Sequence, residues 1–163
     1  GVDTLPDAWK LHVEVLLSLP EPMYQHSLVL LTYHLGWLHA MDSEWTEKYI
    51  LKILESNNLD AIDAFWTGFF WKAKVPSVDL YKRLSPFMLA RSRKEASFKS
   101  RHEDALPGML MAGWATTEDG RRLISDEELR EVLLNAEEKF REKHYGSYHD
   151  GFRKVEKKTY GQN

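Results

Sequence analysis

Residues 62–70 read Ile-Asp-Ala-Phe-Trp-Thr-Gly-Phe-Phe and show the strongest periodicity in the chain. Their bulky apolar side chains fall at positions 62, 65, 66, 69 and 70, at spacings of mostly three and four residues. Such spacing forms one continuous apolar face on an α-helix. The stretch therefore predicts an amphipathic helix whose aromatic side faces a hydrophobic core.

Comparable apolar stripes occur on both sides of this stretch. They lie at residues 9–17, 28–35, 45–53, 80–84 and 129–140. Proline, asparagine and serine separate the stripes, and these residue types commonly end or begin helices. No segment alternates polar and apolar residues for long enough to indicate a strand. We therefore predict an all-α fold with short connections.

Two helix boundaries can be predicted in more detail. Ser125 and Glu128 have the S-x-x-E spacing of a capping box, so we expect a helix to begin there. Pro86 lies inside an otherwise helical pattern, and proline lacks the backbone donor that a helix interior requires. We expect a kink or a new helix start at that point, with Ser85 as its N-cap.

A weak internal repeat supports a more specific architecture. Three apolar segments contain a glycine followed by an aromatic residue, at 36–37, 68–69 and 113–114. The predicted units are three helix pairs and a C-terminal extension, over about 24–56, 58–101, 103–144 and 145–163. Stacked antiparallel helix pairs of this kind form a HEAT-like α-solenoid. An irregular helical bundle is the alternative if the recurrence is coincidental.

The composition is typical of one soluble globular domain. The chain has 163 residues, of which 43% are hydrophobic, and a formal net charge of −3. It has no cysteine, which excludes disulfides and thiolate chemistry and suits a reducing cytoplasm. No window approaches the apolar length of a membrane-spanning helix. Because the chain begins with glycine, we expect a single domain, 1–163, that belongs to a larger cytoplasmic protein.

Charge is distributed unevenly along the chain. Residues 1–71 carry three Lys or Arg against ten Asp or Glu, whereas residues 72–101 carry nine against two. A local positive field of this kind attracts phosphates or acidic protein surfaces. The basic residues that we predict to bind a partner are Lys82, Arg83, Arg91, Arg93, Lys94 and Lys99. The alternative is a solvated helix face that pairs with the acidic segments around it.

Trp71 is a further candidate for partner binding. It follows the aromatic stripe but falls off its face, beside Lys72. Aromatic residues at helical spacing usually belong to the core, whereas exposed tryptophans often concentrate binding energy in interfaces. We therefore predict that Trp71 lies in a partner-binding groove, with a core position as the alternative.

Catalytic and metal-binding motifs are missing from the sequence. His34 and His39 are five residues apart, as are His144 and His149, and this spacing places two rings on different sides of a helix. Serine nucleophile motifs, phosphate-binding glycine loops and dinucleotide fingerprints do not occur. We expect no catalytic residue, no metal and no cofactor in this chain, which would then not itself be an enzyme.

Part of the sequence resembles a known family. The stretches that carry the resemblance are Leu35-Gly36-Trp37-Leu38-His39, Glu44-Trp45, Tyr49-Ile50-Leu51, Ala64-Phe65-Trp66-Thr67-Gly68-Phe69 and Leu84-Ser85-Pro86-Phe87-Met88-Leu89. Together they resemble the helical C-terminal region of large bacterial sirtuin-like proteins of phage defence, over about residues 24–95. The resemblance implies an NAD-cleaving effector in a separate N-terminal domain, with the helical region serving assembly or recognition of a phage protein. It assigns no catalytic residue to this chain.

These observations give one leading expectation and two alternatives. We expect a protein-interaction or sensor module of a larger bacterial defence protein, with another protein or the other domains of its parent chain as partner and no contact with a membrane. The first alternative is a helical protein that binds nucleic acid through residues 72–101. The second is a small helical enzyme without a recognisable motif.

Overall fold

The computed structural model describes residues 4–93, 104–138 and 141. The elements are α1 (Asp7–Leu17), α2 (Met23–Tyr33), α3 (Leu35–Met41), α4 (Ser43–Tyr49), the 3₁₀ helix η1 (Leu51–Glu55), α5 (Leu59–Lys72), α6 (Val78–Arg93), α7 (Ala105–Ala115), β1 (Thr117–Glu118) and β2 (Arg121–Arg122). A further helix covers residues 126–138. The predicted all-α fold is confirmed, because the described part contains no sheet except this two-strand hairpin. Lys94, Lys99 and the predicted extension over 145–163 lie outside the described residues.

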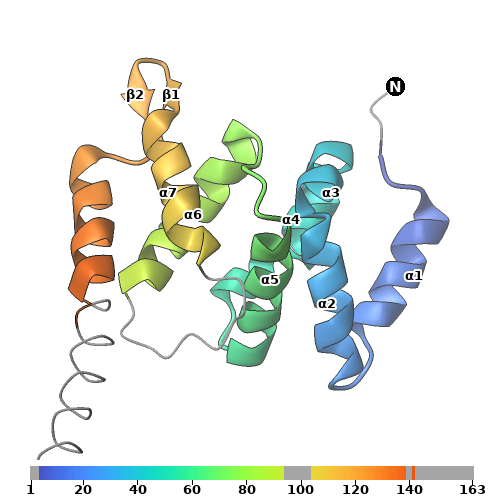
Figure 1. The fold of residues 1–163 in the computed structure, drawn as a ribbon. Helices are drawn as coiled ribbons and strands as arrows, with labels where there is room; N and C mark the ends of the chain where they lie inside the picture. The colour runs from blue at the N-terminus through green and yellow to red at the C-terminus, as the bar shows by residue number, and fades with distance from the viewer. Residues whose placement is uncertain (1–3, 94–103, 139–140, 142–163) are drawn as a thin grey trace, which may run out of the picture.

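The helices lie side by side in a row, with α1 at one end and the 126–138 helix at the other (Figure 1). α1 and α2 run in opposite directions, as do α7 and the 126–138 helix. α2 and α5 lie in the middle of the row and form its most extensive contact. This arrangement is that of stacked helix pairs, whereas the predicted unit boundaries stay a prediction. No helix in the described part is both long and apolar enough to cross a membrane.

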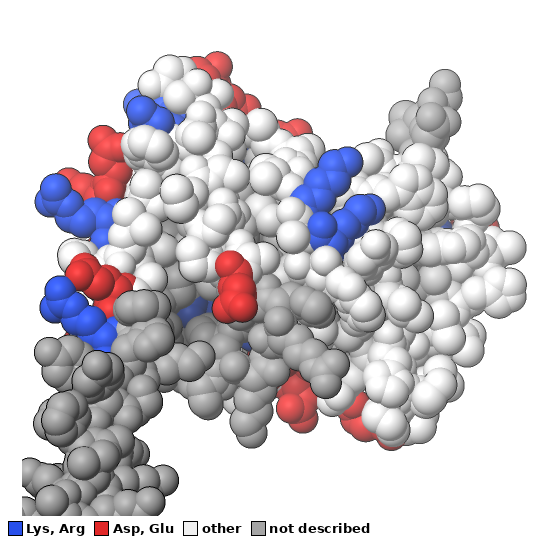
Figure 2. Space-filling view, viewed as in Figure 1, with Lys and Arg blue, Asp and Glu red and all other residues white. Residues whose placement is uncertain are grey.

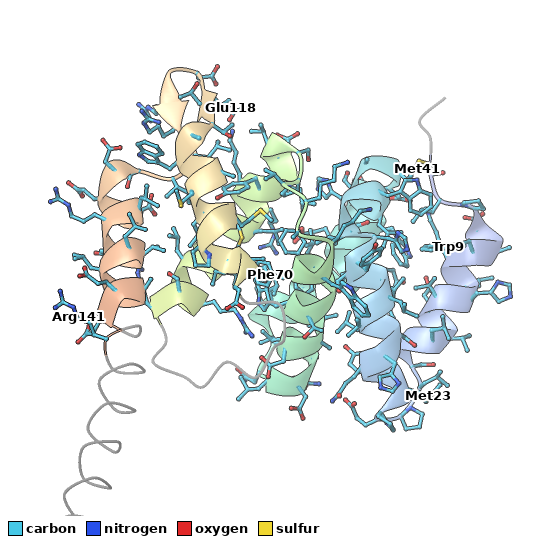
Figure 3. The ribbon with its side chains drawn as sticks, in the orientation of Figure 1. Trp9, Met23, Met41, Phe70, Glu118 and Arg141 are labelled. Atoms are coloured by element: carbon cyan, nitrogen blue, oxygen red, sulfur yellow. The ribbon has the colours of Figure 1, made fainter. Side chains whose placement is uncertain are left out.

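The aromatic stretch of α5 forms the centre of the core, and Figure 3 places Phe70 near the middle of the row. Phe65, Trp66 and Phe70 are almost completely buried. Trp66 stacks on Phe70 with ring centroids 5.2 Å apart, while Phe65 and Phe69 meet the Trp66 ring edge-on. Aromatic side chains bury more apolar area than any others, so this cluster dominates the stabilisation of the fold.

α2 and α5 approach each other closely at Gly68. A methyl group at that position would lie less than 3.0 Å from the Val29 carbonyl and the Thr32 hydroxyl. One turn further on, Tyr33 packs edge-on against Trp71, with ring centroids 6.2 Å apart. Gly68 contacts Val29, and Trp71, later in α5, contacts Tyr33, which is later in α2. The two helices therefore run in the same direction. The first helices of successive stacked units have this relation.

α6 is one continuous helix through Pro86, so the predicted restart with Ser85 as its N-cap is wrong. Pro86 has no N–H to donate to the carbonyl of Lys82 one turn earlier. The Ser85 hydroxyl donates to that carbonyl instead, at 3.2 Å. A side chain thus satisfies the acceptor that the proline leaves open, and the helix continues to Arg93.

Side-chain caps fix where several helices begin. The predicted capping box is confirmed: the Glu128 N–H donates to Ser125 Oγ at 3.1 Å, and the Ser125 N–H donates to Glu128 Oε1 at 3.0 Å. Asp42 and Asn58 each accept the backbone N–H three residues further on, at 3.0 and 3.1 Å. Such caps satisfy backbone donors that the first turn of a helix leaves unpaired.

Candidate functional site

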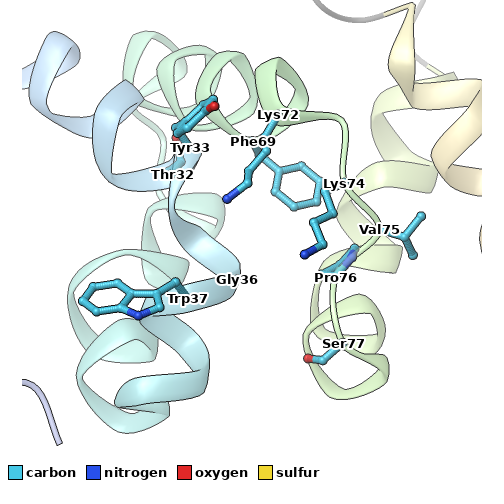
Figure 4. A pocket seen from close by; sticks show the side chains of 10 residues that line it. All are labelled: Thr32, Tyr33, Gly36, Trp37, Phe69, Lys72, Lys74, Val75, Pro76 and Ser77. Atoms are coloured by element: carbon cyan, nitrogen blue, oxygen red, sulfur yellow. The ribbon is translucent and has the colours of Figure 1, made fainter.

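A groove opens where α5 ends and the chain turns towards α6 (Figure 4). It encloses about 450 Å³ and lies against the end of α2 and the start of α3. Sites for small ligands commonly enclose about 300–1,000 Å³. The lining residues are Thr32, Tyr33, Gly36, Trp37, Phe69, Lys72, Lys74, Val75, Pro76 and Ser77. The groove thus combines aromatic walls with two basic side chains.

The local backbone explains why a hollow forms at this place. Ala73 adopts the left-handed conformation, with φ of 48°, which ends α5 and redirects the chain. Ser77 then begins α6, because its Oγ accepts the Leu80 N–H at 3.4 Å. On the opposite wall, a methyl group added at Gly36 would meet no atom within 4 Å. The groove therefore forms because α5 ends abruptly at Ala73 and because Gly36, on the opposite wall, has no side chain to fill the space between them.

Exposed tryptophans extend the apolar surface of the groove. Trp37 in its wall is 51% exposed, and Trp71 just outside it is 57% exposed. Trp71 packs edge-on against Tyr33, and Trp37 packs edge-on against Trp9, with ring centroids 6.2 and 6.3 Å apart. Apolar surface therefore continues beyond Tyr33 on one side and beyond Trp37 on the other. Trp71 is exposed beside a groove, and its partner-binding role stays a prediction.

Lys72 and Lys74 supply the positive charge of the groove. Figure 4 shows both ammonium groups at its edge, between the aromatic wall and the 73–77 linker. The Lys72 ammonium lies 5.4 Å from the centroid of the Tyr33 ring, within the range of a cation–π contact. Across the described residues, no carboxylate forms an ion pair with either lysine.

The predicted binding residue Arg83 lies elsewhere, on the side of α6 that faces α4 and η1. Its Nε donates to Glu47 Oε2 at 3.0 Å, and its Nη2 donates to Glu47 Oε1 at 2.7 Å. The same Nη2 also donates to Glu55 Oε1 at 2.9 Å. This hydrogen bonding from Arg83 holds the pKa of the Glu47 carboxyl below its ordinary value of 4.5. Arg83 therefore joins three elements of the fold.

The Arg83–Glu47 pair predicts how stability depends on pH. A carboxyl with a lowered pKa in the folded state stabilises the fold above its ordinary pKa and loses this contribution as the pH falls through the lowered value. We expect wild type to be more stable than Glu47→Gln at pH 7, by less than about 1 kcal/mol because the pair is partly exposed. The difference should shrink as the pH falls below 4.5, as urea unfolding across this range would measure. Glu44→Gln, without an ion pair in the described part of the chain, is the control; an equal effect would contradict the assignment.

The other described residues of the predicted basic site are also paired. Lys82 pairs with Glu118 of the hairpin, and Arg91 pairs with Asp63 of α5 at 3.0 Å. Arg93 pairs with Glu131 of the 126–138 helix at 3.2 Å. Along the edge formed by the hairpin and this helix, basic and acidic side chains alternate in Figure 2. The described basic residues of α6 therefore do not gather into one positive patch.

A second hollow of about 340 Å³ lies between α7 and the 126–138 helix. Its floor is apolar, with Trp114 and Leu133 among its lining residues, and its rim carries both Arg130 and Glu137. The Trp114 indole N–H is already used, because it donates to Asp126 Oδ1 at 2.6 Å. This hollow therefore carries both signs of charge. The first groove, lined by Thr32 to Trp37 of α2 and α3 and by Phe69 to Ser77 at the end of α5 and below called the α2–α5 groove, carries only positive charge.

No pattern in the sequence brings the groove residues together. Trp37 belongs to the glycine–aromatic recurrence and to a stretch that carries the family resemblance, whereas no pattern singles out Tyr33. The signal that could have found them is a tryptophan close to a helix end: Trp37 is the third residue of α3, and Trp71 is the last but one of α5. Trp114, the last but one of α7, carries the same signal. Comparison with family models, curated proteins and solved structures finds no match to this chain. Its function is therefore inferred from its geometry.

Proposed function

We propose that this chain is a protein-interaction module whose α2–α5 groove holds an extended segment of a partner protein. The observation that carries the proposal is the pair of tryptophans, Trp37 and Trp71, each more than half exposed beside the groove. Tryptophan is the residue type most enriched among those that dominate binding energy in interfaces. Two such side chains at one groove mark a surface that gains stability when a partner covers it.

The extent of the apolar surface favours a peptide over a small molecule. The groove itself is flanked by Trp71 beyond Tyr33 and by Trp9 beyond Trp37. A ligand confined to the hollow would leave the exposed parts of these flanking rings, largest for Trp71, in water. An extended segment of a protein would cover them, and its backbone could follow the line of aromatic contacts.

We propose binding without catalysis at this groove. A general acid or base works when its pKa is tuned by a partner group in the same site. The charged side chains of the groove are Lys72 and Lys74, and in the described part of the chain neither pairs with a carboxylate. The described residues also contain no cluster of three potential metal ligands. The groove geometry therefore supports recognition better than chemistry.

The setting of the module is a further part of the proposal. On the resemblance alone, it would belong to a larger bacterial phage-defence protein with a separate NAD-cleaving domain. The missing cysteines suit the cytoplasm, where such a protein would act. The nucleic-acid alternative has less support, because Lys82, Arg83, Arg91 and Arg93 all have carboxylate partners.

Peptide selection tests the proposed function without a known partner. A random-sequence peptide display library would be selected on the wild-type chain, and the enriched peptides measured on Trp37→Ala. We expect binding to weaken about tenfold or more, because removing a central interface tryptophan commonly costs more than about 1.4 kcal/mol. Leu59→Ala removes an apolar side chain that is also exposed, by 67% against 51% for Trp37, but does not line the groove, and should leave binding unchanged. Failure to enrich any peptide, or equal binding to Trp37→Ala, would contradict the proposal.

A further inference from the structure

We infer that the segment held in the groove is acidic, with carboxylates that meet Lys72 and Lys74 and an apolar side chain between them. This inference rests on the proposed function and specifies the chemistry of the partner. It follows from two observations on the described residues: which basic side chains form ion pairs, and which apolar side chains line the groove.

The groove lysines differ from the other described basic residues of the 72–101 stretch. Lys82, Arg83, Arg91 and Arg93 each have a carboxylate within 4 Å. Within the described residues, Lys72 and Lys74 have none, although residues 1–71 carry ten acidic side chains. Two neighbouring cations that have no counterion among the described residues present a positive site to a ligand.

The surroundings of the two ammonium groups fit a peptide carboxylate. Phe69 and Pro76 lie beside them and form an apolar wall, which suits an aliphatic or aromatic anchor residue. The Thr32 hydroxyl donates to the Leu28 carbonyl at 2.9 Å, so its proton is already used inside α2. The lysine ammonium groups are thus left as strong donors at the edge of the groove.

The charge of the whole chain separates an acidic peptide from a nucleic acid. Nucleic-acid affinity grows with the number of phosphates that a protein neutralises. Here the formal net charge is −3, and the positive site consists of two lysines beside an acidic N-terminal half. A long polyanion would meet repulsion outside the groove, whereas a short acidic segment would place its charges only at Lys72 and Lys74.

The test compares matched probes and matched variants by fluorescence anisotropy. The probes are a short labelled peptide with two glutamates flanking a leucine and a phenylalanine, and the same peptide with glutamines. We expect the glutamate peptide to bind about tenfold more tightly than the glutamine peptide, as two partly exposed ion pairs would give. Lys72→Glu/Lys74→Glu should abolish this preference, and Lys72→Gln/Lys74→Gln should remove most of it. Lys48→Glu/Lys52→Glu changes the net charge equally on α4 and η1, and should keep the preference.

The outcomes separate this inference from the proposed function. Equal binding of both peptides, or a preference that survives charge reversal at Lys72 and Lys74, would overturn the acidic segment while leaving a peptide groove in place. Tighter binding of a short oligothymidylate than of the glutamate peptide would replace the acidic segment with nucleic acid. If neither peptide binds and display selection enriches none, the proposed function fails as well.

Discussion

Replacing Gly68 with alanine should destabilise the protein by about 3 kcal/mol or more. The added methyl group would lie less than 3.0 Å from the backbone carbonyl of Val29 and the hydroxyl of Thr32. A backbone carbonyl inside a helix cannot rotate away, so α2 and α5 would have to separate. That separation loosens the packing of Phe65 and Phe69 in the aromatic core. Urea unfolding, followed by far-UV circular dichroism, would measure the loss.

Gly36→Ala is the matched control for this prediction. Gly36 also precedes an aromatic residue in a helix, but a methyl group there would meet no atom within 4 Å. Alanine should therefore stabilise the protein by about 0.5–1 kcal/mol, because glycine loses more backbone freedom on folding. If Gly68→Ala proves as well tolerated as Gly36→Ala, α2 and α5 do not pack as described.

Gly113→Ala should have the second largest effect, a loss of about 2–3 kcal/mol. Gly113 of α7 faces the phenol of Tyr81 in α6, and a methyl group would overlap both the hydroxyl and the ring. Tyr81 is fully buried and donates to the Met109 carbonyl at 2.8 Å, so it has no free space into which to move. Burial raises the pKa of Tyr81 to about 12, as expected for an enclosed phenol.

A double-mutant cycle isolates this contact. Tyr81→Ala alone should destabilise the protein, because it leaves a cavity and removes the hydrogen bond to the Met109 carbonyl. Adding Gly113→Ala to that variant should cost little, since the phenol that it would meet is gone. The two losses should thus be far from additive. Additive losses in thermal or urea unfolding would show that Gly113 and Tyr81 are not in contact.

The helical content of this protein could be predicted because it depends on local patterns. Apolar residues at spacings of three and four predicted α5, and the S-x-x-E spacing predicted the start of the 126–138 helix. Pro86 misled the prediction, because the Ser85 hydroxyl compensates for the missing donor through a contact that residue type alone does not reveal. The recurrence of glycine before an aromatic residue was visible in the sequence, but the sequence did not show which of these glycines lie at close contacts between helices. Gly68 and Gly113 lie at close contacts between helices, whereas Gly36 lies at an open wall.

The candidate site was harder to predict, because it depends on contacts between distant parts of the chain. The sequence shows nine basic residues in 72–101 but does not show which of them form ion pairs with carboxylates. Arg83 pairs with Glu47, which lies 36 residues earlier, and Arg91 pairs with Asp63, which lies 28 residues earlier. Among the described basic residues of this stretch, the two without a carboxylate partner are Lys72 and Lys74, at the end of α5 and just after it. Their position beside Trp37 follows from the packing of α2 on α5.

The central claim is that the α2–α5 groove is the recognition surface, and the six tryptophans of the chain allow a direct test. A selected peptide would be titrated into the ¹⁵N-labelled protein while the indole N–H signals are followed by NMR. The proposed function predicts that the Trp37 and Trp71 signals shift with the same affinity, whereas the buried Trp66 and the Asp126-bonded Trp114 stay in place. Shifts centred on Trp114, with Trp37 and Trp71 unchanged, would contradict it and place binding in the hollow between α7 and the 126–138 helix.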